Sequence, residues 1–274
     1  MTPKVDIKLG DVQKTLFLPL WGRANETLKE HPLLVDKTAV EIMNRVNYDL
    51  TPIADNMQEI TKFAWIVRSI LMDRVIRSFL VQHPRATVVN IGCGLDTTFD
   101  RVDNGLCRWF DLDLPDVIEL RRQFICPSER RIFISSSFLE DAWLRLLPAK
   151  DGLIFMAAGV LYYFEEKQIK QFFLKLADTF PGSELVCDVC SPLGVRAANK
   201  VVIQASGLDE RSFLKWGIEN IADILKWDSR IGLIKKYPYF KKMKRHLKPR
   251  YRFTALLSDF LKIQYLVHLK FGKA

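Results

Sequence analysis

The chain has 274 residues, of which 49% are hydrophobic and 27% charged, and its formal net charge at pH 7 is +9. This size and hydrophobic content suit one large α/β domain or two small ones. The longest useful apolar run, at 153–161, is too short to cross a bilayer, and residues 1–6 carry no apolar signal segment. We therefore expect a soluble, cytoplasmic protein without a membrane partner.

Residues 1–85 are predicted to form an N-terminal helical cap. Apolar residues recur at three- and four-residue steps from Ile60 to Phe79, which predicts one buried helix face. The helix should end at His83, because the residue before a proline avoids the helical conformation.

Residues 86–190 alternate between short apolar runs and amphipathic stretches. The clearest predicted helix is Glu165–Phe180, which has acids at its start and is followed by Pro181-Gly182. Alternating strands and helices indicate an α/β fold with a doubly wound, mostly parallel sheet that is covered on both faces. The predicted strands of this cofactor-binding core are 87–91, 108–112, 131–135, 153–158 and 184–189.

The remaining residues are predicted to complete the same domain. Residues 191–228 interrupt the alternation with helical sequence of mixed polarity, which we interpret as an inserted helical lid. Residues 229–274 then supply two closing strands, 231–235 and 263–271, and the pattern of the second predicts a partly exposed strand. No linker or repeat divides the chain, so residues 1–274 are predicted to be one domain.

The most informative segment is the turn Gly92-Cys93-Gly94, which directly follows the first predicted strand. Glycines allow a nucleoside cofactor to approach the backbone, and a carboxylate after the next strand, at Asp111 or Asp113, accepts hydrogen bonds from ribose hydroxyls. The dinucleotide fingerprint has a third glycine where this chain has Thr97. S-adenosylmethionine, which has no phosphates, is therefore favoured over NAD or FAD. The alternative is an ordinary turn between a strand and a helix.

Four loops are predicted to meet at one edge of the sheet. Ligands bind beyond the carboxyl ends of parallel strands, at the point where the strand order reverses. The loops that follow the first four strands should therefore converge on one crevice; they contain residues 92–96, 111–113, 136–138 and 158–163.

Two further patterns have competing interpretations. Cys187 and Cys190 have C-x-x-C spacing, but no second pair or nearby histidine completes a zinc site, so we interpret the cysteines as small buried residues and expect no metal. The run 235–252 interleaves Lys and Arg with aromatic residues. We interpret it as a solvated loop, with binding of RNA or an acidic partner as the alternative.

The chain resembles the leucine carboxyl methyltransferase family, and within it the bacterial polyketide O-methyltransferases of the tetracenomycin type. The motifs that carry the resemblance are NIGCGLDTTF at 90–99, FDLDLP at 110–115 and GVLYYF at 159–164. The resemblance implies a class I methyltransferase fold: a Rossmann-like sheet of seven mostly parallel strands, the last of them antiparallel. It also implies S-adenosylmethionine as cofactor and S-adenosylhomocysteine as product.

The resemblance further implies which residues contact the cofactor. Arg68 matches an arginine that binds the methionine carboxylate through two parallel hydrogen bonds, and Arg23 matches a second basic contact. Gly92 and Gly94 match the turn beside the cofactor. Asp113 matches the ribose acid, with Asp111 as its rival.

The adenine side and one departure from the family pattern complete the predicted cofactor site. Ser137 and Phe138 occupy the place of the pair that flanks adenine. Ala158 stands where relatives often carry an acid, in a motif of the type A-E-G-V-L. The missing carboxylate either weakens cofactor binding or leaves room for a different substrate, and the sequence leaves both open.

Methyl transfer from a sulfonium is an in-line displacement, so the enzyme mainly aligns the reactants and excludes water. A carboxylate acceptor needs no general base, whereas a phenol would benefit from one. Tyr163 is predicted to line the acceptor pocket and orient the acceptor oxygen; the alternative is packing under the lid. Arg196 is predicted to hold an acidic substrate at the pocket mouth.

The sequence thus favours O-methyl transfer to a carboxylate or hydroxyl of a small acceptor, polyketide-like or another secondary metabolite. Three alternatives stay open: a protein carboxyl methyltransferase, an RNA-binding methyltransferase that uses 235–252, and a non-catalytic cofactor-binding protein. Nucleic acid is the less favoured partner, because 157–163 lacks the Asn/Asp-Pro-Pro-aromatic motif of base-amine methylation. The oligomeric state is not predicted.

Overall fold

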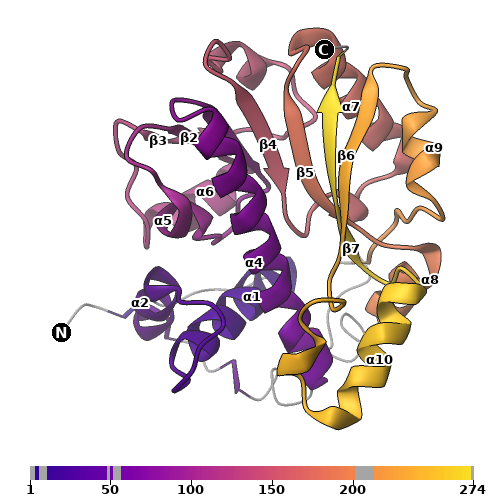
Figure 1. Ribbon diagram of the computed structural model, residues 1–274. Coiled ribbons are helices and arrows are strands. Elements are labelled where there is room, and N and C mark those ends of the chain that lie inside the picture. The colour runs from indigo at the N-terminus through magenta and orange to yellow at the C-terminus, as the bar shows by residue number, and fades with distance from the viewer. Residues whose placement is uncertain (1–3, 6–10, 48–49, 52–56, 201–212, 273–274) are drawn as a thin grey trace.

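A seven-stranded sheet forms the centre of the computed structural model, which describes residues 4–5, 11–47, 50–51, 57–200 and 213–272 (Figure 1). The strand order is β3-β2-β1-β4-β5-β7-β6. Strands β1 to β5 pair in parallel, and β7 runs antiparallel to both β5 and β6. The predicted sheet, with its antiparallel last strand, is confirmed. The strands are β1 Thr87–Ile91, β2 Arg108–Asp113, β3 Arg131–Ser135, β4 Leu153–Ala157, β5 Glu184–Val189, β6 Ile231–Pro238 and β7 Tyr265–Phe271.

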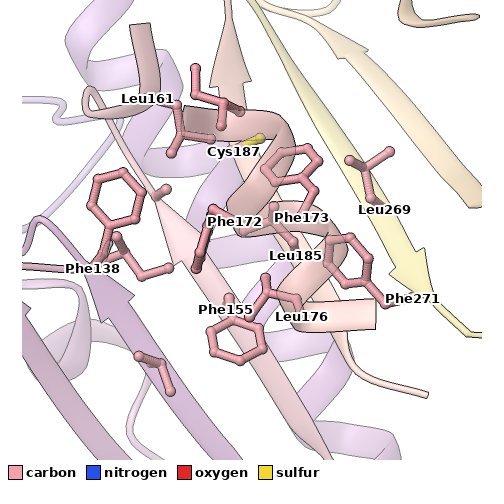
Figure 2. Packing of buried hydrophobic residues seen from close by; sticks show 14 of the residues in the cluster. Phe138, Phe155, Leu161, Phe172, Phe173, Leu176, Leu185, Cys187, Leu269 and Phe271 are labelled. Atoms are coloured by element: carbon pink, nitrogen blue, oxygen red, sulfur yellow. The ribbon is translucent and has the colours of Figure 1, made fainter. Parts of the chain in front are cut away.

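Helices cover both faces of the sheet. Neighbouring residues of a strand face opposite sides, so Val88 packs in the cluster beneath α4 (Glu59–Gln82) and Val89 in the cluster beneath α7 (Glu166–Thr179). Figure 2 shows the cluster beneath α7, in which phenylalanines of α7 pack on side chains from β4, β5 and β7. The other helices are α1 Asp11–Thr27, α2 Lys37–Arg45, α5 Thr98–Val102, α6 Pro115–Arg122, α8 Pro192–Ala198, α9 Ile221–Leu225 and α10 Pro249–Phe260.

The ends of two helices confirm the sequence signals for them. The capping residue of α4 is His83, directly before the proline, as predicted. Helix α7 begins with a capping box: the side chain of Glu165 accepts from the backbone of Gln168, and the side chain of Gln168 accepts from the backbone of Glu165.

Two expectations for the C-terminal region are wrong. Strand β7 is buried rather than partly exposed, because it lies between β5 and β6 instead of at the sheet edge. The basic run 235–252 is not a plain loop. It begins on β6, which extends to Pro238, passes through a 3₁₀ turn at Lys244–His246 and enters α10.

The carboxyl ends of the parallel strands point toward one end of the molecule. Figure 1 shows α1, α8 and α10 gathered at that end, below the strand tips. Helix α8 lies in the predicted lid, but residues 201–212 of that segment are outside the described residues, so the lid stays a prediction. In the part of the chain that the structure describes, no helix is long and apolar enough to cross a membrane.

Candidate active site

A cavity of about 890 Å³ lies at the carboxyl ends of β1 to β4. The loops after these four strands all line it, as the strand pattern predicted. Its remaining walls come mainly from α1, α4, α6, α8 and α10 and from the segments beside β6 and β7. Most of the lining residues are apolar, and the polar ones lie mainly on the loops after the strands and on α1, α4 and α10.

The glycine turn after β1 forms one wall of the cavity. Gly92 and Gly94 have φ angles of +60° and +46°, in the left-handed region that favours glycine. A Cβ at Gly92 would lie 2.5 Å from the side chain of Val160, and one at Gly94 would lie 2.9 Å from Leu16. The protein's own packing therefore requires both glycines, in addition to any ligand that approaches the turn.

Asp113, at the end of β2, places its carboxylate against this turn. Oδ2 accepts a hydrogen bond from the backbone N–H of Gly94 at 2.7 Å, and Oδ1 accepts one from Leu114 at 2.8 Å. The side chain also lines the cavity. Burial raises the pKa of Asp113, and the two N–H groups offset only part of that rise. The cavity wall thus presents a carboxylate directly beside the glycine turn.

Asp111, the rival ribose acid, lies elsewhere. It is fully buried and is not one of the residues that line the cavity. Its Oδ2 pairs with Arg121 at 2.8 Å and with Arg131 at 3.0 Å, and Arg121 also donates to the carbonyl of Gly94 at 2.8 Å. Asp111 therefore supports the glycine turn from below, and its inclusion among the cofactor contacts is corrected.

Arg68 reaches the cavity from α4. Its Nη1 lies 3.2 Å from Oδ2 of Asp188 and 3.4 Å from the hydroxyl of Tyr162. Burial lowers the pKa of Arg68, but Asp188, Tyr162 and Tyr239 together raise it by more, so the guanidinium stays charged. Among the described residues, none accepts a hydrogen bond from its Nε or Nη2. One edge of the guanidinium is thus held by the protein and the other is available to a ligand.

Asp188 is a site residue that the sequence reasoning missed. It is fully buried at the end of β5, where Oδ1 accepts the backbone N–H of Gly159 at 2.7 Å and Oδ2 accepts from Gln264 at 2.8 Å. Ala158, which lines the cavity next to Gly159, has no charge to offer. A carboxylate on the neighbouring strand thus lies behind the position where relatives often carry an acid. An acid inside an apolar strand was the available sequence signal for it.

Ser137 and Phe138 line the cavity beside the end of β3, and their place beside an adenine stays a prediction. Phe138 is 6% exposed and packs edge-on against Phe164 and Phe172, with ring centroids 4.7 and 5.0 Å away. Its ring is therefore fixed from behind and forms a rigid apolar wall.

Arg23, on α1, lies at the cavity but is already paired. Its Nε donates to Oδ2 of Asp36 at 2.8 Å, and Arg101 donates to the same oxygen at 2.7 Å. Burial raises the pKa of Asp36, but the two arginines and the hydrogen bonds from Thr97 and Ala39 together lower it by more, so it remains ionised. Arg23 thus ties the N-terminal helices to the segment after the glycine turn, and its contact with a cofactor stays a prediction.

The two predicted catalytic residues lie in different places relative to the cavity. Tyr163 lines the cavity, and burial raises its pKa to about 12. Arg196 is exposed and is not part of the cavity wall, although Ala197 and Ala198 beside it are. The structure therefore places Tyr163 in the cavity wall and Arg196 outside it, and the contact of either residue with an acceptor stays a prediction.

The C-x-x-C pair is two free, buried cysteines. Cys187 belongs to the core cluster drawn in Figure 2, and Cys190 packs with Tyr162 and Leu214. Burial raises the pKa of both thiols. Both cysteines therefore act as small packing residues, as the sequence interpretation held.

Comparison with known proteins adds independent findings. The family model described as leucine carboxyl methyltransferase matches residues 17–177. The tetracenomycin polyketide synthesis O-methyltransferase TcmP of Streptomyces glaucescens is 29% identical over 216 residues, which are 78% of each chain. An S-adenosyl-L-methionine-dependent methyltransferase of Gibberella zeae is 25% identical over 66% of this chain and 65% of its own length.

A solved structure shares the fold. The crystal structure of a putative methyltransferase from Thermobifida fusca has a TM-score of 0.59 and is 14% identical, over 92% of this chain and 94% of that one. This likeness concerns the architecture alone, because the sequence identity is low.

Proposed function

Because the chain belongs to the leucine carboxyl methyltransferase family and is an S-adenosylmethionine-dependent methyltransferase, we propose that it methylates an oxygen atom of a small, largely apolar acceptor. The observation that carries this proposal is the shared cavity. It joins a carboxylate beside a glycine turn, at Asp113 and Gly94, to a guanidinium with a free edge, at Arg68. A nucleoside that carries an amino acid needs these two kinds of group.

This arrangement assigns protein residues to each part of the cofactor. Asp113 accepts hydrogen bonds from the ribose hydroxyls, beside the backbone of Gly92 and Gly94. Ser137 and the rigid ring of Phe138 flank the adenine. Arg68 binds the methionine carboxylate through the nitrogens that Asp188 leaves free. The bound cofactor supplies a methyl group on a sulfonium, which is already activated for displacement.

The protein's part in the reaction is alignment and exclusion of water. Asp188 holds the guanidinium of Arg68 and the backbone of Gly159 in place, one on each of its oxygens. It is therefore a positioning residue, and its charge lies near the place of the missing family acid. The hydroxyl of Tyr163 is protonated at neutral pH, since its pKa is about 12. It therefore serves as a hydrogen-bond donor to the acceptor oxygen and not as a base.

The acceptor occupies the part of the cavity away from the strand ends. That part is walled by apolar side chains of α4 and α10 and of the segments beside β6 and β7, among them Trp65, Met72, Phe240, Leu257 and Ile263. Such walls favour an apolar or aromatic body with one polar atom to be methylated. Of the two arginines among the described lining residues, Arg68 is assigned to the cofactor and Arg23 is paired with Asp36, so acceptor binding relies on shape and burial.

Titration with S-adenosylhomocysteine tests the cofactor assignment. A ligand that binds only the folded protein stabilises it by RT ln(1 + L/Kd), where L is the free ligand concentration, so we expect the unfolding temperature to rise with the ligand concentration and to keep rising logarithmically above Kd. NAD is the matched control, because it carries an adenosine but no amino acid, and should give no increase. Equal shifts with both ligands, or none with S-adenosylhomocysteine at millimolar concentration, would refute the assignment.

Replacing Tyr163 with Phe tests the acceptor side. Loss of one hydrogen bond to the acceptor oxygen should lower kcat about 10-fold, while the Kd for S-adenosylhomocysteine stays the same. Steady-state kinetics and calorimetry measure the two quantities. Arg196→Ala is the control, because its exposed side chain lies outside the cavity wall and both quantities should stay unchanged. A full rate in Tyr163→Phe would remove the tyrosine from the mechanism.

A further inference from the structure

Helix α10 exposes an apolar stripe that the proposed function does not use. Phe253 and Phe260 are 75% and 80% exposed, and three leucines between and beside them are 37–42% exposed: Leu256, Leu257 and Leu261. These residues are spaced by three and four positions, so they share one side of the helix. Single exposed apolar residues are ordinary, but a contiguous stripe with two phenylalanines marks a contact surface.

The opposite side of α10 fixes the helix to the molecule. Ala255 is fully buried in the cluster beneath α4, and the carboxylate of Asp259 accepts a hydrogen bond from the backbone N–H of Phe240 on each of its oxygens at 3.1 Å. Figure 1 shows α10 at the periphery of the molecule, at the end where the parallel strands terminate. The contacts of Ala255 and Asp259 thus fix α10 so that its apolar stripe faces outward.

Positive charge surrounds the stripe. Residues 241–262 contain eight Lys and Arg residues and one acid, Asp259, which is turned inward toward Phe240. The exposed members of the set are Lys241, Lys242, Arg245, Lys248, Arg250, Arg252 and Lys262. An apolar stripe flanked by bases complements a surface that is apolar inside and negatively charged at its face.

The cavity opens beside the same helix. Thr254, Leu257, Ser258 and Leu261 line it, so α10 is a cavity wall on one flank and an exposed apolar edge on the other. Leu257 and Leu261 belong to both. A body that covers the stripe therefore also lies at the cavity.

We propose that α10 docks on an anionic lipid bilayer, with Phe253 and Phe260 among the acyl chains and the surrounding bases at the headgroups. A second copy of the chain would bring two basic faces together, and a nucleic acid would satisfy the charges but leave the leucines in water. The expectation of no membrane partner is thereby revised to peripheral docking. The inference about the acceptor rests on the proposed function: the acceptor is a lipophilic molecule that enters the cavity from the bilayer.

Co-sedimentation of the full chain with lipid vesicles tests the docking. We expect at least about tenfold more protein on vesicles with about 30% phosphatidylglycerol than on pure phosphatidylcholine, and loss of that difference at high salt. The double variant F253S/F260S should lower binding about tenfold or more. The matched control is L28S/V81S, which removes two side chains that are 72% and 81% exposed elsewhere, and it should bind as the wild type does.

Each other outcome overturns the docking. Equal binding to both vesicle types excludes the role of charge, and an equal loss in L28S/V81S excludes a specific stripe. A concentration-dependent dimer that F253S/F260S abolishes would assign the stripe to a second copy, and retention of RNA without vesicle binding would assign the bases to nucleic acid. Binding of S-adenosylhomocysteine is read separately, because neither phenylalanine lines the cavity, so failure of the docking and failure of the methyltransferase assignment are distinguishable.

Discussion

Asp111→Asn is expected to lower the free energy of unfolding by about 3–5 kcal/mol. The carboxylate of Asp111 is fully buried and pairs with two guanidinium groups, those of Arg121 and Arg131. The amide retains an oxygen acceptor but no charge, so Arg121 stays buried without its anion, and Arg131 keeps only its pair with Asp100. Equilibrium unfolding in urea measures the change through the transition midpoint at constant slope.

The control for this prediction is a carboxylate–arginine pair in water. Asp178 contacts Arg230 at 2.6 Å and its side chain is 64% exposed, so Asp178→Asn should change the unfolding free energy by no more than about 1 kcal/mol. If Asp111→Asn is as mild as the control and instead abolishes cofactor binding, then Asp111 is the ribose acid and the assignment of Asp113 fails.

Asp113→Asn is expected to weaken binding of S-adenosylhomocysteine by about 10- to 100-fold, since a hydrogen bond to a charged group contributes about 1.5–3 kcal/mol. Its stability should change by no more than about 1 kcal/mol, because the amide oxygen can still accept the N–H of Gly94. Calorimetric titration measures the Kd. Glu119→Gln, an exposed change on α6, is the control and should bind normally. Undiminished affinity in Asp113→Asn would remove this carboxylate from the cofactor site.

The same carboxylate gives the affinity a pH dependence. Burial raises the pKa of Asp113, so as the pH falls it becomes protonated earlier than an ordinary aspartate does. Protonation removes the charged acceptor, so the wild-type affinity should decline as the pH falls through that pKa, while Asp113→Asn lacks this decline. The sign for folding is opposite: a folded-state pKa above the unfolded one means that the ionised group destabilises the fold, and this cost disappears at lower pH.

The sequence by itself determined the order of strands and helices through β5, and the meeting of the loops after β1 to β4. These features are local, because a short apolar run that is followed by a glycine turn favours a strand and a turn. Parallel pairing then brings the carboxyl ends of the strands to one edge. The family motifs lie on those same loops, so most of the cofactor wall was predictable.

The tertiary structure decided what depends on neighbours distant in the sequence. Asp111 and Asp113 share a face of β2, and only the packing of Arg121 and Arg131 shows that one is covered while the other reaches the cavity. Asp188 gained its role from Arg68, which is 120 residues away.

The C-terminal region depended most on the tertiary structure. Strand β7 alternates like a half-exposed strand, yet insertion between β5 and β6 buries it. The sequence did not predict helix α10, because it begins within a basic run. Its exposed apolar stripe follows from the packing of the opposite side of the helix on the core. Sequence patterns report which residues can be buried, but only the packed chain determines which of them find a partner.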